Sequence, residues 1–246
     1  MPGDVEHYER LAARFEVNWA YSPEFVAWMT GCILTRLDPR PGDRAADIGC
    51  GTGLYARGLA ERAGPVVCVD PAAGMLERLP AGGVFVPVRA SLEDVAAGTA
   101  ALPCGRFDVV LAKEVLHHAA DQAAGIRALA GLVAPGGRLL IVMLPPVLGY
   151  PLFTAALERY RRHPADPAGV ARSLVDCGLR AEMSAESFRL VIPKQRWLEM
   201  VADRYMSLLA KFDDQQLQAG LAEIDSRYPG PLLEFDDRFI FVLARR

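Results

Sequence analysis

Three glycines at alternate positions follow an acidic residue at the end of a short apolar stretch. Gly49, Gly51 and Gly53 come directly after a predicted strand that contains Asp47. Glycine lets the backbone turn sharply and approach a ligand closely, and the helix expected next presents its N-terminal amides at the same place. We therefore expect a nucleotide-like ligand at the end of this strand. An acid at Asp47 would repel a pyrophosphate and attract an ammonium group.

The spacing of the glycines distinguishes between two classes of nucleotide-binding site. Dinucleotide enzymes carry a third glycine inside the helix, in the pattern G-x-G-x-x-G, whereas this chain has Leu54 there. A second acid, Asp70, ends the apolar stretch Val66–Asp70. It lies about 20 residues beyond the glycines, where a ribose-binding carboxylate is expected. As an alternative, Asp70 caps a helix over Ala72–Leu79.

Several segments together carry a family resemblance. Gly49–Gly53 with Asp47 resembles motif I of the class I S-adenosylmethionine-dependent methyltransferases of small-molecule type. Lys113–Ala119 resembles the family's segment after strand four, and Ala134–Val142 resembles its turn into strand five. The resemblance covers about residues 44–143. The Asn/Asp-Pro-Pro-Tyr tetrad of enzymes that methylate nucleobase or amide nitrogens is not found there.

The order of elements predicts an α/β fold. Between residues 44 and 143, strands and helices alternate five times, which is typical of a parallel sheet with helices on both faces. With the resemblance, this implies a doubly wound, seven-stranded, mostly parallel sheet, with strands six and seven at about 187–192 and 238–243. We expect one domain over 1–246, with an N-terminal helical cap (1–37), a cofactor-binding core (44–143), and substrate-side helices and last strands (144–246). A helical insertion is expected before the last strand.

The resemblance implies S-adenosylmethionine as the cofactor and S-adenosylhomocysteine as its product. The acid that often follows strand three in related enzymes and contacts the adenine amino group is replaced by Ala90. Ser91, or the backbone near Leu92, is expected to take that role. The expected cofactor-binding residues are Asp47, Gly49, Cys50, Gly51, Gly53, Asp70, Pro71, Met75, Ser91, Leu92 and Lys113.

Methyl transfer from a sulfonium is a direct displacement that depends mainly on positioning, which can supply on the order of 7–11 kcal/mol in model reactions. A hydroxyl acceptor also needs a base. His117 is the first candidate because imidazole titrates near neutrality. Glu114 is a weaker one, and His118 is assigned mainly to packing or hydrogen bonding. The expected substrate contacts are Trp19, Tyr21, His117, Arg204 and Tyr205. No metal site is expected from four histidines and no cysteine cluster.

Length, composition and charge limit the classes of function that are possible for this chain. A length of 246 residues with 52% hydrophobic content predicts one full core. A net charge of −3 argues against a nucleic-acid partner, which favours a basic surface. No signal peptide or membrane-spanning apolar run is visible, and five cysteines without C-x-x-C spacing predict reduced thiols. We therefore expect a cytoplasmic protein without a membrane partner. The oligomeric state is open.

The first functional hypothesis is methyl transfer to a small molecule, with bacterial secondary metabolism as the expected setting. The alternative from a different class is a protein that binds S-adenosylmethionine without methylating, such as a cyclase-like or regulatory protein. A nicotinamide oxidoreductase is disfavoured by Leu54 and by the lack of a Tyr-x-x-x-Lys pair. An RNA or protein methyltransferase is disfavoured by the acidic charge.

Overall fold

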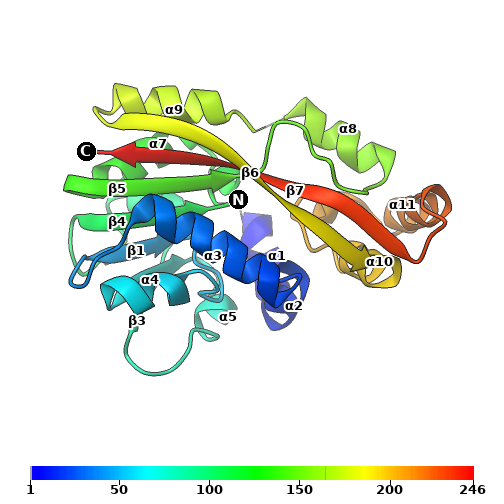
Figure 1. Ribbon diagram of the computed structural model, residues 1–246, viewed down its shortest axis with the longest axis horizontal. Helices are drawn as coiled ribbons and strands as arrows, with labels where there is room; N and C mark the ends of the chain where they lie inside the picture. Colours follow the sequence, from blue (N-terminus) through cyan, green and yellow to red (C-terminus); the bar gives the residue numbers. More distant parts are fainter. Residues whose placement is uncertain (1, 164) are drawn as a thin grey trace.

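A computed structural model describes residues 2–163 and 165–246 of the chain (Figure 1). Seven strands form one sheet in the order β3-β2-β1-β4-β5-β7-β6. The strands are β1 (Ala45–Ile48), β2 (Val66–Asp70), β3 (Phe85–Arg89), β4 (Phe107–Lys113), β5 (Val133–Met143), β6 (Arg180–Pro193) and β7 (Leu232–Arg245). β1 to β5 pair in parallel, and β7 is antiparallel to both β5 and β6. This confirms the expected doubly wound, mostly parallel sheet.

Helices cover both faces of the sheet (Figure 1). They are α1 (Pro2–Leu11), η1 (Ala12–Arg14), α2 (Phe15–Trp19), α3 (Pro23–Leu37), α4 (Ala56–Ala63), α5 (Ala73–Leu76), α6 (Leu92–Ala97), η2 (Leu116–His118), α7 (Gln122–Gly131), α8 (Thr154–Arg162), α9 (Pro167–Asp176), α10 (Lys194–Ala202), η3 (Leu209–Lys211) and α11 (Asp214–Arg227). Within the described residues, no helix has both the length and the apolar character needed to cross a membrane.

The central strands are buried on both faces, which explains their continuous apolar runs. In β4, Val109 and Leu111 pack into one hydrophobic cluster, whereas Val110 and Ala112 pack into the other on the opposite face. β1 lies between β2 and β4, so the strand order reverses at this point. Ligands of open α/β sheets bind beyond the carboxyl ends of strands at such a switch point. The sheet therefore places the candidate site at the end of β1.

The last two strands are longer than the sequence suggested. β6 and β7 each span 14 residues and pair in register from Arg180–Arg245 to Pro193–Leu232. Only a part of each strand, 187–192 and 238–243, mostly in its C-terminal half, was expected. The outer parts alternate polar and apolar residues, because the hairpin they form is buried on one face and exposed on the other over much of its length.

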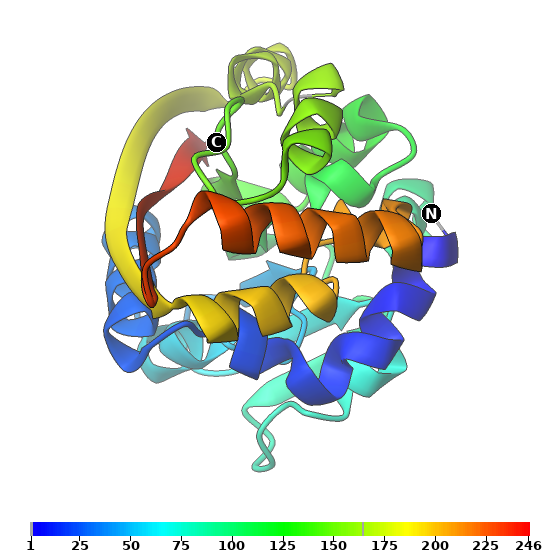
Figure 2. The same ribbon diagram turned by 90° about the vertical axis from the view of Figure 1, so that its right-hand side faces the viewer.

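The far ends of β6 and β7 carry the helical insertion. α10 and α11 lie side by side there, next to the N-terminal helices (Figure 2). A capping box starts α11, since Asp213 Oδ1 accepts a hydrogen bond from Gln216 N at 2.8 Å and Gln216 Oε1 accepts one from Asp213 N at 3.1 Å. At the start of α3, Ser22 Oγ accepts a hydrogen bond from Phe25 N at 3.2 Å, with Pro23 as the first helical residue.

Replacing Gly220 of α11 by alanine should destabilise the fold. A Cβ at this position would lie 2.5 Å from Cγ and Cδ1 of the Phe153 ring, and such overpacking typically costs about 1–3 kcal/mol. Thermal unfolding should show a loss of about 2–4 °C for each kcal/mol. Gly131→Ala in α7 is the matched control, because a Cβ there would meet no atom within 4 Å. Equal melting temperatures for the two variants would contradict the packing of α11 on Phe153.

Candidate active site

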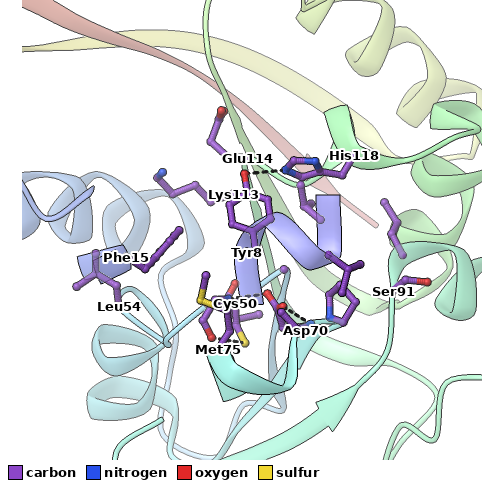
Figure 3. A pocket seen from close by; sticks show the side chains of 18 of the residues that line it. Tyr8, Phe15, Cys50, Leu54, Asp70, Met75, Ser91, Lys113, Glu114 and His118 are labelled. Carbon is purple, nitrogen blue, oxygen red and sulfur yellow. Dashed lines mark hydrogen bonds between the residues drawn. The ribbon is translucent and has the colours of Figure 1, made fainter. Parts of the chain in front are cut away.

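A pocket opens beyond the carboxyl ends of β1, β2 and β4, at the predicted position (Figure 3). It brings together residues from five segments of the chain, which lie within 5–19, 47–55, 70–75, 91–93 and 113–119. The expected residues that line it are Trp19, Asp47, Gly49, Cys50, Gly51, Asp70, Pro71, Met75, Ser91, Leu92, Lys113 and Glu114. Gly53, Tyr21, His117, Arg204 and Tyr205 were also expected at the site, but they are not among the residues that line this pocket.

The glycine loop requires glycine for both conformational and steric reasons. Gly49 and Gly51 have φ angles of 74° and 55°, in the left-handed region that side chains other than glycine rarely adopt. A Cβ on Gly49 would lie 2.7 Å from Val115 Cγ2. Gly53 does not line the pocket, but this position of the loop also leaves no room for a side chain. A Cβ there would lie 2.5 Å from Leu79 Cδ2. The backbone is thereby held close to the pocket floor.

Asp70 at the end of β2 fixes the two loops that form this floor. Its Oδ2 accepts a hydrogen bond from Gly51 N and its Oδ1 accepts one from Ala72 N, both at 2.9 Å. Burial raises the pKa of Asp70, although these two backbone hydrogen bonds act in the opposite direction. A carboxylate has about four acceptor positions, so further positions remain for the two hydroxyls of a ribose.

The alternative reading of Asp70 as a helix cap is not what the structure shows. The N-cap residue of α5 is Ala72, and no side chain of that residue caps the helix. Instead, Glu9 reaches over from α1 and accepts hydrogen bonds from Ala73 N at 2.6 Å and Gly74 N at 2.8 Å. The N-terminal helix therefore caps α5, which leaves Asp70 for the pocket.

Asp47 and Lys113 set the electrostatics of the deepest part of the pocket. Asp47 is 3% exposed, and burial, together with the nearby charge of Asp70, raises its pKa to about 7, with Lys113 acting in the opposite direction. Burial lowers the pKa of Lys113, partly offset by Glu114, Asp237 and Asp47. The Lys113 Nζ lies 5.2 Å from the ring centroids of both Tyr55 and Phe239. A buried carboxyl of this kind favours a positively charged group as its ligand.

The N-terminal helices cover the pocket and contribute residues that the sequence did not single out. The Tyr8 side chain is hydrogen-bonded to His118, with 3.1 Å between the hydroxyl and Nε2 (Figure 3). Glu16 accepts hydrogen bonds from Thr52 Oγ1 at 2.8 Å and Arg57 Nη2 at 2.5 Å. These contacts attach the cover to the glycine loop and to η2, so Tyr8 and Phe15 become pocket walls. The contact of Tyr8 joins positions 110 residues apart, so no local sequence pattern predicts it.

The two histidines after β4 lie in different surroundings. His118 lines the pocket, whereas His117 is exposed and lies outside the lining residues. Both belong to the short turn η2, in which successive side chains point in different directions. His118 was expected to serve in packing or hydrogen bonding, and it is hydrogen-bonded to Tyr8. A base role for His117 stays a prediction. Glu114 does line the pocket, and burial raises its pKa.

Ser91 and its neighbour Glu93 stand at the edge of the pocket where α6 begins. The Ser91 hydroxyl donates a hydrogen bond to Asp94 Oδ2 at 2.7 Å and accepts one from Asp94 N at 3.1 Å, which makes it part of a capping box. Glu93 lines the pocket, and its Oε1 accepts a hydrogen bond from Ala120 N at 2.9 Å. Glu93 is an acid of the first turn of α6 and was not among the expected site residues.

The expected substrate residues lie at different depths. Trp19 lines the pocket. Tyr21 and Tyr205 are buried behind it, and the Trp19 Nε1 donates a hydrogen bond to Tyr205 O at 3.2 Å. Arg204 does not reach the pocket, because its Nη2 binds Asp214 Oδ1 at 2.7 Å and Phe212 O at 3.3 Å. In the part of the chain that the structure describes, no cluster of three or more His, Cys, Asp or Glu side chains could hold a metal ion.

These groups fit one kind of ligand. Asp47 suits an ammonium group, Asp70 suits vicinal hydroxyls, and the glycine backbone allows close approach. The apolar side chains of Met75 and Leu92 offer a surface for a planar base. An amino-acid ammonium, a ribose and a purine occur together in S-adenosylmethionine.

Comparisons with known proteins agree with this fit. A family described as "Methyltransferase domain" matches residues 46–141. A ubiquinone biosynthesis O-methyltransferase of Xanthomonas axonopodis is 35% identical over 166 residues, covering 61% of this chain and 67% of that protein. An uncharacterized methyltransferase of Mycobacterium bovis is 41% identical over 110 residues, covering 45% of this chain and 55% of that one. The chain thus matches about half to two thirds of the length of these relatives.

Solved structures show the same fold. A protein described as a putative methyltransferase from an antibiotic biosynthesis pathway of Anabaena variabilis has a TM-score of 0.66 at 18% identity, covering 87% of this chain and 96% of that one. A phosphoethanolamine N-methyltransferase of Haemonchus contortus, solved with S-adenosylhomocysteine, has a TM-score of 0.57 at 21% identity, covering 89% and 52%. With the sequence relatives and the fitted pocket, these findings show that the chain belongs to the class I S-adenosylmethionine-dependent methyltransferases and that its cofactor is S-adenosylmethionine.

Proposed function

We propose that this chain transfers a methyl group from S-adenosylmethionine to a hydroxyl oxygen of a small-molecule acceptor. The observation that carries the proposal is the pair of buried carboxyls, Asp47 and Asp70, on either side of the glycine loop. The choice of oxygen is supported by the relatives named as O-methyltransferases of ubiquinone biosynthesis. The net charge of −3 favours a small acceptor over a nucleic acid.

The chain's own residues contribute positioning and the exclusion of water. When bound, the cofactor supplies a methyl group activated by a sulfonium. Asp47 would hold the ammonium group and Asp70 the ribose hydroxyls, while Tyr8 and Phe15 close the pocket from above. Fixing the reacting groups in line can lower the barrier by on the order of 7–11 kcal/mol in model reactions. Because the sulfonium charge disappears during transfer, a dry pocket favours the transition state over the charged reactants.

The experiment that tests the proposal is a calorimetric titration with S-adenosylhomocysteine, with NAD as the control ligand. A screen with labelled S-adenosylmethionine and phenols, catechols and amines follows. Micromolar binding of S-adenosylhomocysteine and label on a hydroxyl oxygen support the proposal. Binding without transfer to any acceptor favours the non-methylating alternative. A preference for NAD would contradict the cofactor assignment.

Asp70→Asn should weaken cofactor binding about 30-fold. The amide keeps the shape of the carboxyl, but it loses the charge-assisted hydrogen bonds to the ribose hydroxyls, worth about 2 kcal/mol. Calorimetry with S-adenosylhomocysteine measures the change in Kd. Asp108→Asn is a control that alters a carboxyl bound to Arg44 outside the pocket. A wild-type Kd for Asp70→Asn would remove Asp70 from the ribose site.

The two histidines should affect different steps. His118→Ala should weaken S-adenosylhomocysteine binding about fivefold, because the loss of one hydrogen bond, here to Tyr8, costs about 1 kcal/mol. His117→Ala should leave this Kd within about twofold, because the side chain lies outside the pocket lining. Turnover then tests the base prediction, since an unchanged rate for His117→Ala removes it as the base. A large Kd effect for His117→Ala alone would contradict the placement.

The proposal extends to other predictions made from the sequence. They include the division of the chain into cap, core and substrate-side parts, a role in bacterial secondary metabolism, and a cytoplasmic location. Glu114 as a base, and Arg204 as a substrate contact, belong to the same group. Fractionation of the source cells and an acceptor screen are the measurements that bear on them.

A further inference from the structure

The side chain of Lys113, the last residue of β4, stands in the wall of the pocket. It is half-buried, and no described residue accepts a hydrogen bond from it or forms an ion pair with it. Glu114, Asp237 and Asp47 act on Lys113 through their charges, without a hydrogen bond. Its Nζ is not among the fully buried polar atoms, so the ammonium is accessible from the pocket. Its three donors are therefore available to a ligand.

The pocket has room for an acceptor beside the cofactor. Its empty space, with the open mouth included, is about 1160 Å³, compared with roughly 300–1,000 Å³ for typical pockets of small ligands. Figure 3 shows the Lys113 amine on the side of the pocket that Phe15 and Leu54 line, with Asp70 and Ser91 on the other side. Because the acceptor must meet the methyl group beyond the ribose, it approaches the side on which Lys113 lies.

Aromatic rings surround this ammonium. The Lys113 Nζ lies 5.2 Å from the ring centroids of Tyr55 and Phe239 and 5.9 Å from that of Trp19. Tyr55 and Trp19 also line the pocket, whereas Phe239 is buried behind them. The Trp19 ring is fixed, since its Nε1 donates a hydrogen bond to Tyr205 O at 3.2 Å. The pocket therefore offers preformed aromatic faces beside the charge, on which another aromatic ring packs well.

An ammonium in these surroundings calls for an anionic ligand. Burial lowers the pKa of Lys113, and the three carboxyl groups near it offset this effect only in part. The aromatic faces attract the cation, but they do not replace the oxygen acceptors of water. A carboxylate supplies both a negative charge and acceptors for the lysine donors. Because a carboxylic acid is ionised at neutral pH and a phenol of the tyrosine type is not, a carboxylate pairs with Lys113 without first losing a proton.

S-adenosylmethionine has a carboxylate of its own, but the charges around Lys113 favour a second one. Of the three carboxyl groups that raise the pKa of Lys113, Glu114 contributes most and Asp47 least. Asp47 is the residue proposed above for the cofactor's ammonium group. The ammonium and carboxylate of an amino acid are attached to one carbon atom, so the cofactor's carboxylate stays close to Asp47. The charge of Lys113 is therefore left for the acceptor.

We propose that Lys113 is a specificity-determining residue for the acceptor, and that its ammonium binds the carboxylate of an aromatic acid whose ring packs on Trp19 and Tyr55. The acceptor class is thus a hydroxylated aromatic acid, in which the carboxylate is bound and the hydroxyl receives the methyl group. The inference rests on the proposed function for the role of this acid as acceptor. The binding of the acid can be measured without any reaction.

The test compares benzoate with benzamide, which has nearly the same shape and no charge. Each is titrated calorimetrically into the full chain saturated with S-adenosylhomocysteine. We expect benzoate to bind at least about tenfold more tightly than benzamide, since a hydrogen bond between charged groups is worth this factor. Lys113→Met removes the charge and keeps most of the length of the side chain. It should raise the Kd of benzoate at least about tenfold and leave that of benzamide unchanged.

Lys194→Met is the matched control, because the Lys194 Nζ donates a hydrogen bond to Tyr228 O at 3.0 Å, outside the pocket lining. Its benzoate affinity should equal that of the wild type. Melting temperatures verify that each variant is folded, and Lys113→Gln supplies a second variant that removes the charge and keeps a polar end.

The affinity for the cofactor product distinguishes the two carboxylates that could pair with Lys113. The Kd of S-adenosylhomocysteine should change by no more than about twofold in Lys113→Met, since a cofactor contact through the backbone of this residue is unaffected by the change of side chain. A larger increase would assign the ammonium to the cofactor's own carboxylate and overturn the inference.

The outcomes separate this inference from the proposed function. Equal affinities for benzoate and benzamide, or no binding of benzoate by the wild type, overturn the inference even where methyl transfer occurs. Benzoate binding that depends on Lys113, without methyl transfer to any hydroxyl, supports the anion site and overturns the proposed function. Where transfer occurs, hydroxybenzoates should have a lower KM than the corresponding hydroxybenzamides, and Lys113→Met should remove this difference. Equal KM values in the wild type overturn the inference alone.

Discussion

Asp47→Asn should weaken binding of S-adenosylhomocysteine at least about 100-fold and at the same time stabilise the unliganded protein. The asparagine side chain has nearly the same shape, but it offers no charge to the ammonium group of the ligand. Asp47 is 3% exposed, so little water is present to replace the lost interaction. A loss of about 3 kcal/mol corresponds to a factor of about 100 in Kd. Calorimetry of both proteins measures it.

The stabilisation follows from the sign of the pKa shift. Burial and Asp70 raise the pKa of Asp47 from its usual 3.8 to about 7 in the folded state. The neutral carboxyl therefore contributes stability that is fully present below pH 4 and is lost as the pH rises through about 7. At pH 8 the charged carboxyl costs roughly 4 kcal/mol relative to the neutral one. Denaturant unfolding should show a gain for Asp47→Asn at pH 8 and little gain at pH 4.

The same shift predicts how cofactor binding depends on pH. Below about pH 7 the carboxyl of Asp47 is protonated in the unliganded protein and must release its proton to pair with an ammonium group. The wild-type affinity for S-adenosylhomocysteine should therefore fall about tenfold for each pH unit below 7. The dependence should be much weaker in Asp47→Asn. Identical pH profiles for the two proteins would contradict an ammonium site at Asp47.

The sequence predicted those site residues whose backbone conformation or position at a strand end depends on the local sequence. The glycines of the loop need positive φ angles at fixed spacing, and Gly49 and Gly51 have them. Asp70 was found because it ends a strand whose parallel pairing with β1 places both carboxyl ends together, with Cys68 opposite Asp47. Strand ends of a parallel sheet meet at one edge, so sequence order alone brought these side chains into one pocket.

The residues missed are those that depend on contacts distant in sequence. Tyr8 and His118 are 110 positions apart, and only the packing of α1 over η2 brings them together. Asp237 was not considered, because the expected strand began at residue 238. With the full length of β7, the alternation of Leu233, Phe235 and Phe239 places Asp237 on the inner face. Strand length was thus the information that the sequence pattern did not supply.

Gly51→Val should abolish measurable binding of S-adenosylhomocysteine, raising its Kd at least about 1,000-fold. Gly51 has a φ angle of 55°, and a Cβ on it would lie 3.3 Å from Cε1 of Phe15, in the wall of the pocket. Valine is branched at Cβ, so its methyl groups would occupy space beside the loop where the ligand must approach. The Gly51 amide also donates to Asp70 Oδ2, so a shift of this backbone would displace the carboxyl that we propose as the ribose ligand.

Gly42→Val is the matched control for backbone strain. Gly42 also has a positive φ angle, 89°, but a Cβ there would meet no atom within 4 Å, and the residue lies outside the pocket lining. Both variants should lose about 1–3 kcal/mol of stability through strain, as seen by thermal unfolding. Only Gly51→Val should lose the ligand in calorimetry. Loss of binding in both would attribute the effect to strain, and retained binding in Gly51→Val would show that the cofactor does not lie against this loop.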